Sequence, residues 1–154
     1  MSLGNIISRC TVALANAASK LQSLQIRMLA GEIKDNVEYL EPYGYTACPH
    51  PGAEGVAVFP GGDRSHGVVI VVADRRFRLQ GLKPGEVALF TDEGDKIHFE
   101  RGHKLTINTG ALTVNATEAV DILSPQLLHN GVNVGATHNH GGVQFGDSRT
   151  SGPG

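Results

Sequence analysis

Several features that decide the class of many proteins are missing from this sequence. It contains no tryptophan and only two cysteines, Cys10 and Cys48, which do not form a CxxC pair. Two such cysteines are too few for a disulfide scaffold, so we expect free thiols in a reducing compartment. The longest strongly apolar run, Val68–Ala73, is far too short for a membrane-spanning helix, which needs about 20 residues.

An excess of positive charge is also missing. The formal net charge is -2 at pH 7, and aromatic residues make up only 5% of the chain. A nucleic-acid-binding barrel of the OB type would instead use a basic groove with aromatic stacking platforms. We therefore expect no nucleic-acid partner, and an OB-fold binding module is the weaker alternative.

The composition that is present favours β structure. Twenty glycines and seven prolines separate short runs rich in valine and isoleucine. The N-terminal segment, residues 1–20, is the exception, because its apolar residues recur at spacings of three or four and predict an amphipathic helix. These residues are Ile6, Cys10, Leu14, Ala17 and Leu21. A secretion signal is disfavoured because Arg9 is a weak basic start and polar residues interrupt the apolar run.

Residues 21–95 read as a small all-β domain. Five β-like runs are each bounded by turn residues such as Pro60-Gly61-Gly62-Asp63, and they cover Gln22–Leu29, Val37–Tyr45, Gly55–Phe59, Gly67–Ala73 and Glu86–Thr91. The unbroken apolar run in the fourth predicts a fully buried central strand. Five strands of this size suggest an OB-fold-like closed barrel.

Residues 96–135 change to short segments with strict alternation. Ile97, Phe99, Leu105 and Ile107 share one parity, and further alternating residues follow the turn at Gly110, namely Leu112, Val114, Ala116, Val120 and Ile122. Such thin, one-sided strands have too little surface to form a core within one chain. Three copies wound about a common axis would bury the apolar parity, so we expect an intertwined trimeric β-helix.

The segment 136–154 contains the candidate metal ligands, His138 and His140. Residues two apart on a strand point the same way, and these histidines continue the parity of Val132, Val134 and Ala136. Two nitrogens are too few for one ion, but three chains would supply six imidazoles, an octahedral set. That set suits iron, nickel or cobalt better than a tetrahedral zinc site.

Other interpretations of the histidine pair remain open. It could lie in an exposed polar loop, and the glycine-rich residues 141–154 could be a flexible tail or a tight turn around an ion. A cupin-like metalloenzyme would need a third histidine and a downstream carboxylate, where Gln144 and Phe145 stand here. Barrel-type metal hydrolases carry their pair on the first strand of a much longer chain.

The chain resembles the central spike proteins of contractile-tailed bacteriophages, the Mu-like baseplate spike or baseplate assembly protein V family. The resemblance covers nearly the whole chain, and its most specific motif is Thr137-His138-Asn139-His140-Gly141-Gly142. It also rests on Glu41-Pro42-Tyr43-Gly44-Tyr45, Gly52-Ala53-Glu54, Gly61-Gly62-Asp63-Arg64-Ser65-His66-Gly67-Val68-Val69, Asp74-Arg75-Arg76-Phe77-Arg78-Leu79 and Gly81-Leu82-Lys83-Pro84-Gly85-Glu86-Val87-Ala88.

This resemblance implies an all-β homotrimer with an OB-fold at its base, a triple-stranded β-helix as its shaft and a pointed C-terminal apex. His138 and His140 match the family's histidine pair, which implies one iron ion per trimer. It further implies a structural, non-enzymatic protein of the virion tail tip that contacts baseplate hub and tail tube proteins. The host cytoplasm would be the place of assembly, and the host outer membrane would be pierced transiently. The basic cluster Asp74-Arg75-Arg76 with Arg78 is either a solvated hairpin or a contact to a neighbouring baseplate protein.

Overall fold

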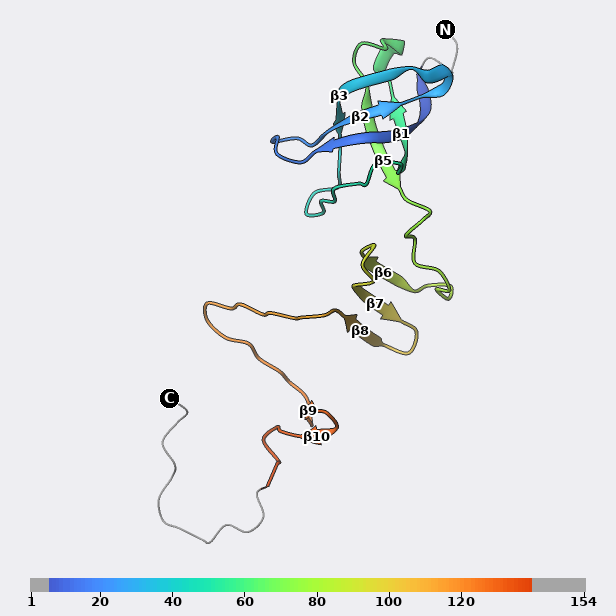
Figure 1. Cartoon of the computed structure of the whole chain (residues 1–154). Helices are drawn as coiled ribbons and strands as arrows, with labels where there is room; N and C mark the ends of the chain where they lie inside the picture. The colour runs from blue at the N-terminus through green and yellow to red at the C-terminus, as the bar shows by residue number, and fades with distance from the viewer. Residues whose placement is uncertain (1–5, 140–154) are drawn as a thin grey trace. The chain divides into compact units, whose positions relative to one another are not determined.

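The computed structural model describes residues 6–139, and within this range the protein is all β (Figure 1). It divides into two compact units, residues 1–111 and residues 112–154. The first unit contains a closed barrel and a three-stranded sheet, and the second contains a two-stranded hairpin. No helix in the described range is long and apolar enough to cross a membrane.

The barrel has five strands in the order β1-β2-β3-β5-β4, and β4 pairs with β1 to close it. The strands are β1 (Ile7–Asn16), β2 (Ser23–Arg27), β3 (Ile33–Tyr39), β4 (Glu54–Val58) and β5 (Val68–Ala73), with 3-10 turns η2 (Leu29–Gly31) and η3 (Pro60–Gly62). Only the β3–β5 pair is parallel. The predicted small closed barrel is therefore confirmed.

The barrel core is formed by the inward parity of its strands. On β2 the predicted alternation holds, because Leu24 and Ile26 are buried and Met28 follows them inward. Phe59, which directly follows β4, is the largest of the fully buried side chains. The complete buried cluster comprises Cys10, Val12, Leu24, Ile26, Met28, Val37, Tyr39, Ala53, Ala57, Phe59 and Val69.

The helix predicted for residues 1–20 is wrong, because residues Ile7–Asn16 form β1. This strand pairs with β2 on one edge and β4 on the other, so the barrel satisfies its backbone along both sides. Cys10 and Val12 point into the core with the two-residue period of a strand. A register shift between Val12 and Leu14 then breaks this alternation, and Leu14 is largely exposed.

Two further expectations about the barrel are corrected. The predicted fifth strand, Glu86–Thr91, contains β6 (Val87–Phe90), which belongs to the separate sheet, and β1 takes its place in the barrel. The run Val68–Ala73 is not fully buried, since Ile70 and Val71 are 49% and 50% exposed. A register shift between Val56 and Ala57 of β4 lets β5 present these two residues outward.

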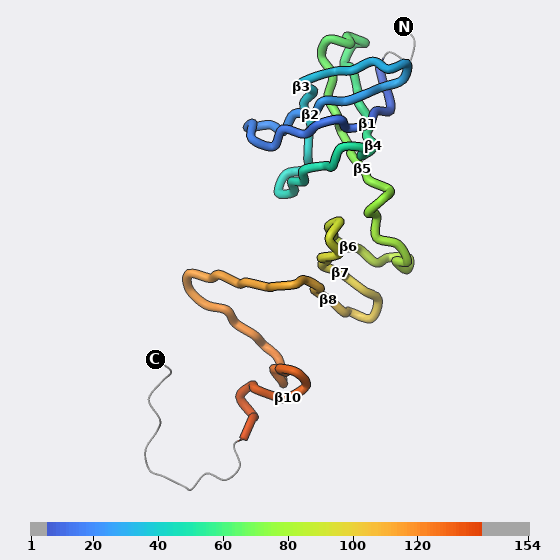
Figure 2. Tube along the Cα trace, in the orientation of Figure 1, coloured from blue at the N-terminus to red at the C-terminus, as the bar shows by residue number. Residues whose placement is uncertain are grey.

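The three-stranded sheet has the order β6-β7-β8, with β7 spanning Lys96–Glu100 and β8 spanning Lys104–Asn108. The trace in Figure 2 runs from β5 to β6 through residues 74–86, which contain no strand. Both strand pairs are antiparallel. Strands β7 and β8 fall in the range 96–135 for which the sequence predicts a shaft, whereas β6 falls in the range predicted for the barrel.

The second unit is described from Leu112 to Asn139. Its only strands in that range are β9 (Leu128–His129) and β10 (Val132–Asn133). They are joined by Asn130-Gly131, both with positive φ (50° and 79°), the usual two-residue hairpin connection. The alternating segment from Leu112 to Ile122 forms no strand within the chain, and the trimeric β-helix stays a prediction.

Candidate metal site and assembly surface

His138 lies just after a compact turn. Asn133 organises this turn, because its side-chain oxygen accepts the Gly135 N–H at 3.0 Å and its amide nitrogen donates to Thr137 Oγ1 at 2.8 Å. The backbone N–H of His138 donates to Gly135 O at 3.1 Å. The predicted strand leading to the histidine pair therefore ends at Asn133 rather than continuing to His140.

The imidazole of His138 is exposed and oriented by the same turn. Its Nδ1 lies 2.6 Å from the carbonyl oxygen of Gly135, which fits an Nδ1–H donor. In this tautomer Nε2 carries the lone pair that binds metal, and a backbone carbonyl on the other ring nitrogen is the usual support of a ligating histidine. His140 lies outside the described residues, so the geometry of the pair stays a prediction. Within residues 6–139 no group of three or more His, Cys, Asp or Glu side chains is placed to hold an ion.

One face of the three-stranded sheet is apolar and uncovered. Its register aligns Val87 with Phe99 and Leu105, and Leu89 with Ile97 and Ile107. These six residues, which we call the bare face, are between 37% and 60% exposed. Aligned cross-strand residues point to the same side of a sheet, so the bare face is continuous over all three strands.

The second unit is similarly uncovered. Large apolar side chains recur along it with 40% to 96% of their surface exposed, and none is buried in the described part. They are Leu112, Val114, Val120, Ile122, Leu123, Leu127, Leu128, Val132 and Val134. Large exposed apolar patches on soluble proteins mark interaction surfaces. This surface includes the residues whose parity the sequence assigned to an interchain core.

The opposite side of the three-stranded sheet is polar and has internal partners. The carboxylate of Glu86 accepts the backbone N–H groups of Lys83 and Arg101 at 2.9 and 3.2 Å, which lowers its pKa below the ordinary value. His98 Nε2 lies 3.4 Å from Glu86 Oε2, and the side chains of His98 and Glu86 are mostly buried. His98 thus contacts a carboxylate of its own chain.

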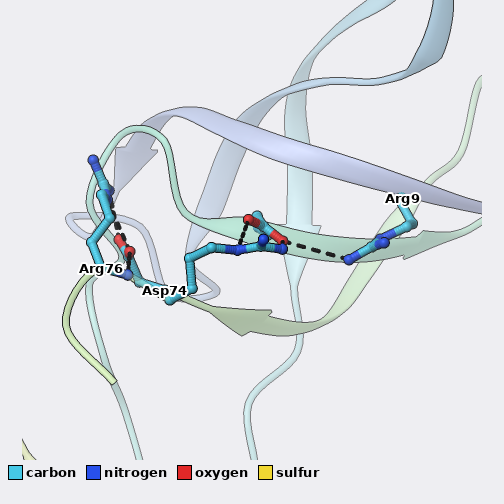
Figure 3. Close-up of polar contacts among 5 residues, drawn as sticks. Arg9, Asp74 and Arg76 are labelled. Atoms are coloured by element: carbon cyan, nitrogen blue, oxygen red, sulfur yellow. Dashed lines mark hydrogen bonds and ion pairs between the residues drawn. The ribbon is translucent and has the colours of Figure 1, made fainter. Parts of the chain in front are cut away.

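The predicted basic cluster is largely paired within the chain. Figure 3 shows Asp74 and Arg76 beside each other. Glu54 forms ion pairs with two arginines, Arg9 at 3.5 Å and Arg75 at 2.6 Å. Hydrogen bonding from Arg76 lowers the pKa of Asp74, and the same contact raises the pKa of Arg76. These ion pairs give most of the cluster partners within its own chain. Arg9 and Arg75 are also exposed, so both remain accessible to a neighbouring protein.

Two further histidines occupy distinct places. His66 lines an open cleft of about 410 Å³ together with Lys34 and Asp35. His50 Nε2 lies 3.2 Å from Oδ2 of Asp92, in the turn between β6 and β7. Sequence reasoning missed this contact because its two residues are far apart in the chain and belong to different elements.

Comparison with known proteins identifies the family. Residues 9–76, nearly the whole barrel, match the family described as bacteriophage Mu Gp45, N-terminal. The chain is 32% identical over 126 residues to the baseplate puncturing device gp45 of Escherichia phage Mu, covering 82% of this chain and 64% of that protein. It is 35% identical over 133 residues to the Mu-like prophage FluMu protein gp45 of Haemophilus influenzae, covering 82% of this chain and 72% of that one. The chain thus spans less than two thirds of the length of the first relative and somewhat more of the second. It belongs to the family of Mu-like phage baseplate spike proteins.

Proposed function

We propose that this protein is a structural, non-enzymatic spike at the tip of a contractile phage tail, where three copies form one piercing body. The observation that carries this proposal is the bare face, because a chain with its own complete core would not present six aligned apolar residues to water. The relative in phage Mu is named a puncturing device, which supports the same task here.

Three copies bury the apolar side chains that one copy leaves exposed. Covering apolar surface stabilises an assembly by about 25 cal/mol for each square ångström removed from water, so this surface provides the driving force. The three-stranded sheet and the apolar positions from Leu112 to Val134 then form the shaft, a β-helix shared by three chains. The closed barrel already has its own core and forms the base as an OB-fold.

The apex of this trimer binds one metal ion through His138 and His140 of each chain. Six imidazole nitrogens make an octahedral set, which suits iron, with nickel or cobalt as other transition metals of this preference. The contact from His138 Nδ1 to the Gly135 carbonyl supports the proposal, because it orients the ring and leaves Nε2 as the ligating atom. When bound, the ion supplies coordinate bonds that hold three chain ends together.

The role of the ion is structural. Six protein ligands leave no open coordination position for water or substrate, which both hydrolytic and redox catalysis would need. An ion held by three chains binds only the assembled state, so its binding free energy adds to the stability of the trimer. Without the ion, the three chain ends at the apex would separate when the apex is pressed against a resisting surface.

The partners and location follow from the same proposal. The barrel contacts baseplate hub and tail tube proteins in the virion, and the apex meets the host outer membrane transiently when the sheath contracts. Assembly takes place in the host cytoplasm. The relatives' names support a baseplate location, and the family match over the barrel supports a shared attachment surface on this domain.

Light-scattering mass combined with elemental analysis tests the proposal. We expect a particle of three times the 16.3 kDa chain mass and one transition-metal ion per three chains. A monomer with one ion per chain would favour the cupin-like alternative. A trimer without one metal ion per three chains would support the proposed shaft but contradict the proposed metal site at the apex.

A further inference from the structure

A loop and a turn of the barrel are fastened to each other by one arginine. Arg76 Nη2 donates to the carbonyl oxygen of Pro51 at 2.9 Å. The same guanidinium donates to Asp74 through Nε (2.9 Å) and Nη2 (2.5 Å), so its position is fixed from both sides (Figure 3). Gly52 makes this approach possible, since it has φ +93° and a Cβ there would lie 3.0 Å from Arg76 Nη1.

This fastened pair also contacts the three-stranded sheet. The ring of Phe77 lies with its centroid 5.2 Å from the Arg76 guanidinium carbon and 5.4 Å from the His50 ring. His50 Nε2 in turn lies 3.2 Å from Oδ2 of Asp92. Asp92 belongs to the tight turn between β6 and β7, where Thr91 N donates to Asp95 O at 3.0 Å.

We propose that His50, Asp74, Arg76, Phe77 and Asp92 form a clasp that couples the barrel to the β6–β7 hairpin. Without the clasp, the barrel and the hairpin are connected by residues 74–86, a segment without strands. With the clasp, the loop 48–52 also contacts the β6–β7 hairpin directly. The clasp is a property of one chain and goes beyond the proposed function.

The contact between His50 and Asp92 is the weaker end of the clasp. Asp74 is paired with Arg76, whereas Glu93 and Asp95 share the turn with Asp92. His50 and Asp92 are partly exposed, so solvent keeps the energy of their contact small, and the clasp adjusts the coupling rather than locking it.

The clasp gives a mechanical link in the proposed spike, and this use rests on the proposed function. A force that enters through the barrel passes to the hairpin through the loop 48–52 as well as through the chain itself. The barrel and the hairpin therefore move together more closely than the connecting segment 74–86 alone would make them.

Amide hydrogen exchange on the intact chain tests the clasp. The peptides that report on it cover residues 48–53, 74–78 and 91–95, and the variants are His50→Gln, Asp92→Asn and the double variant. Glu93→Gln is the matched control, because it removes the same charge from the same turn.

We expect each single variant to exchange about two- to fivefold faster than the wild type in all three peptides, with no further gain in the double variant. The coupling is overturned if only the substituted segment changes or if Glu93→Gln has the same effect. The light-scattering mass of the same samples reports separately on trimer formation, so either idea can fail without the other.

Discussion

Gly67 lies against the ring of Phe59, and a Cβ at position 67 would be 2.7 Å from Cε1 of that ring. Phe59 is the largest of the fully buried side chains. Glycine at position 67 therefore serves packing rather than turn geometry. The barrel accommodates the Phe59 ring because the backbone just before β5 has no side chain there.

Gly67→Ala should destabilise the barrel by about 1–3 kcal/mol, because the added methyl group overpacks a filled core and cannot displace a fixed ring. The change in the free energy of unfolding is measured by denaturant unfolding, with a spectroscopic signal that reports on the barrel. Gly110→Ala is the control, since a Cβ at that position meets nothing within 4 Å. Equal unfolding free energies for the two variants would show that Phe59 can move aside.

Phe99→Asp should disrupt the trimer while leaving the barrel folded. Phe99 is part of the bare face, and burying such a side chain contributes about 2–3 kcal/mol per chain, to which the cost of desolvating a charge is added. Sedimentation at several concentrations gives the assembly constant. The control is Leu29→Asp, because Leu29 is 80% exposed on the barrel and lies outside the bare face. Loss of the trimer in the control would mean that the barrel surface is also part of the interface.

The double variant His138→Ala with His140→Ala should lose the metal ion and lower the stability of the trimer. At free-ion concentrations a hundred to a thousand times the dissociation constant, the lost linkage corresponds to about 3–4 kcal/mol. Elemental analysis and melting curves with and without a chelator measure both effects. A chelator should shift the wild type and leave the double variant unchanged. Unaltered metal content would show that the site is elsewhere.

Acid should loosen the turn held by Glu86. Backbone N–H groups of Lys83 and Arg101 lower its pKa in the folded state, so its contribution is present above the unfolded value of about 4.3 and is lost as the pH falls through the lower, folded value. Glu86→Gln should therefore lower the free energy of unfolding at neutral pH. It should also make that free energy less dependent on pH below about pH 4. Lys83→Ala is the control, because it retains the backbone donor. A wild-type acid limb in Glu86→Gln would contradict this assignment.

The sequence predicted the parts of the fold that depend on local alternation. Leu24 and Ile26 are buried on one strand as expected, and the apolar parity of Ile97, Phe99, Leu105 and Ile107 lies on one face of β7 and β8. Residues Ile7–Asn16 were mispredicted because a register shift breaks the alternation and leaves a spacing that resembles a helix. Pairing with two neighbouring strands decides that segment, and such pairing is not visible in local periodicity.

The candidate metal site was predicted from spacing, and the structure places His138, the first predicted ligand, in a different local geometry from the one expected. His138 follows a turn organised by Asn133 rather than continuing a strand. A side chain that bonds its own backbone competes with strand formation, and this signal was present in the Asn-Val-Gly sequence at residues 133–135. The proposed trimer and its ion depend on contacts between chains. A single sequence indicates such contacts only through the apolar surface that one folded chain leaves exposed.

The bare face of the β6–β7–β8 sheet has a consequence for the order of folding events. The barrel encloses its own core and can fold at a rate independent of dilution, whereas a face that is completed by other copies can be stabilised only when chains collide. Refolding should therefore separate into a fast, concentration-independent phase and a slower phase whose rate rises with protein concentration. Newly made chains that share one messenger RNA would meet at high local concentration, which favours completing the shaft before the exposed strands β6 and β8 pair with unrelated chains.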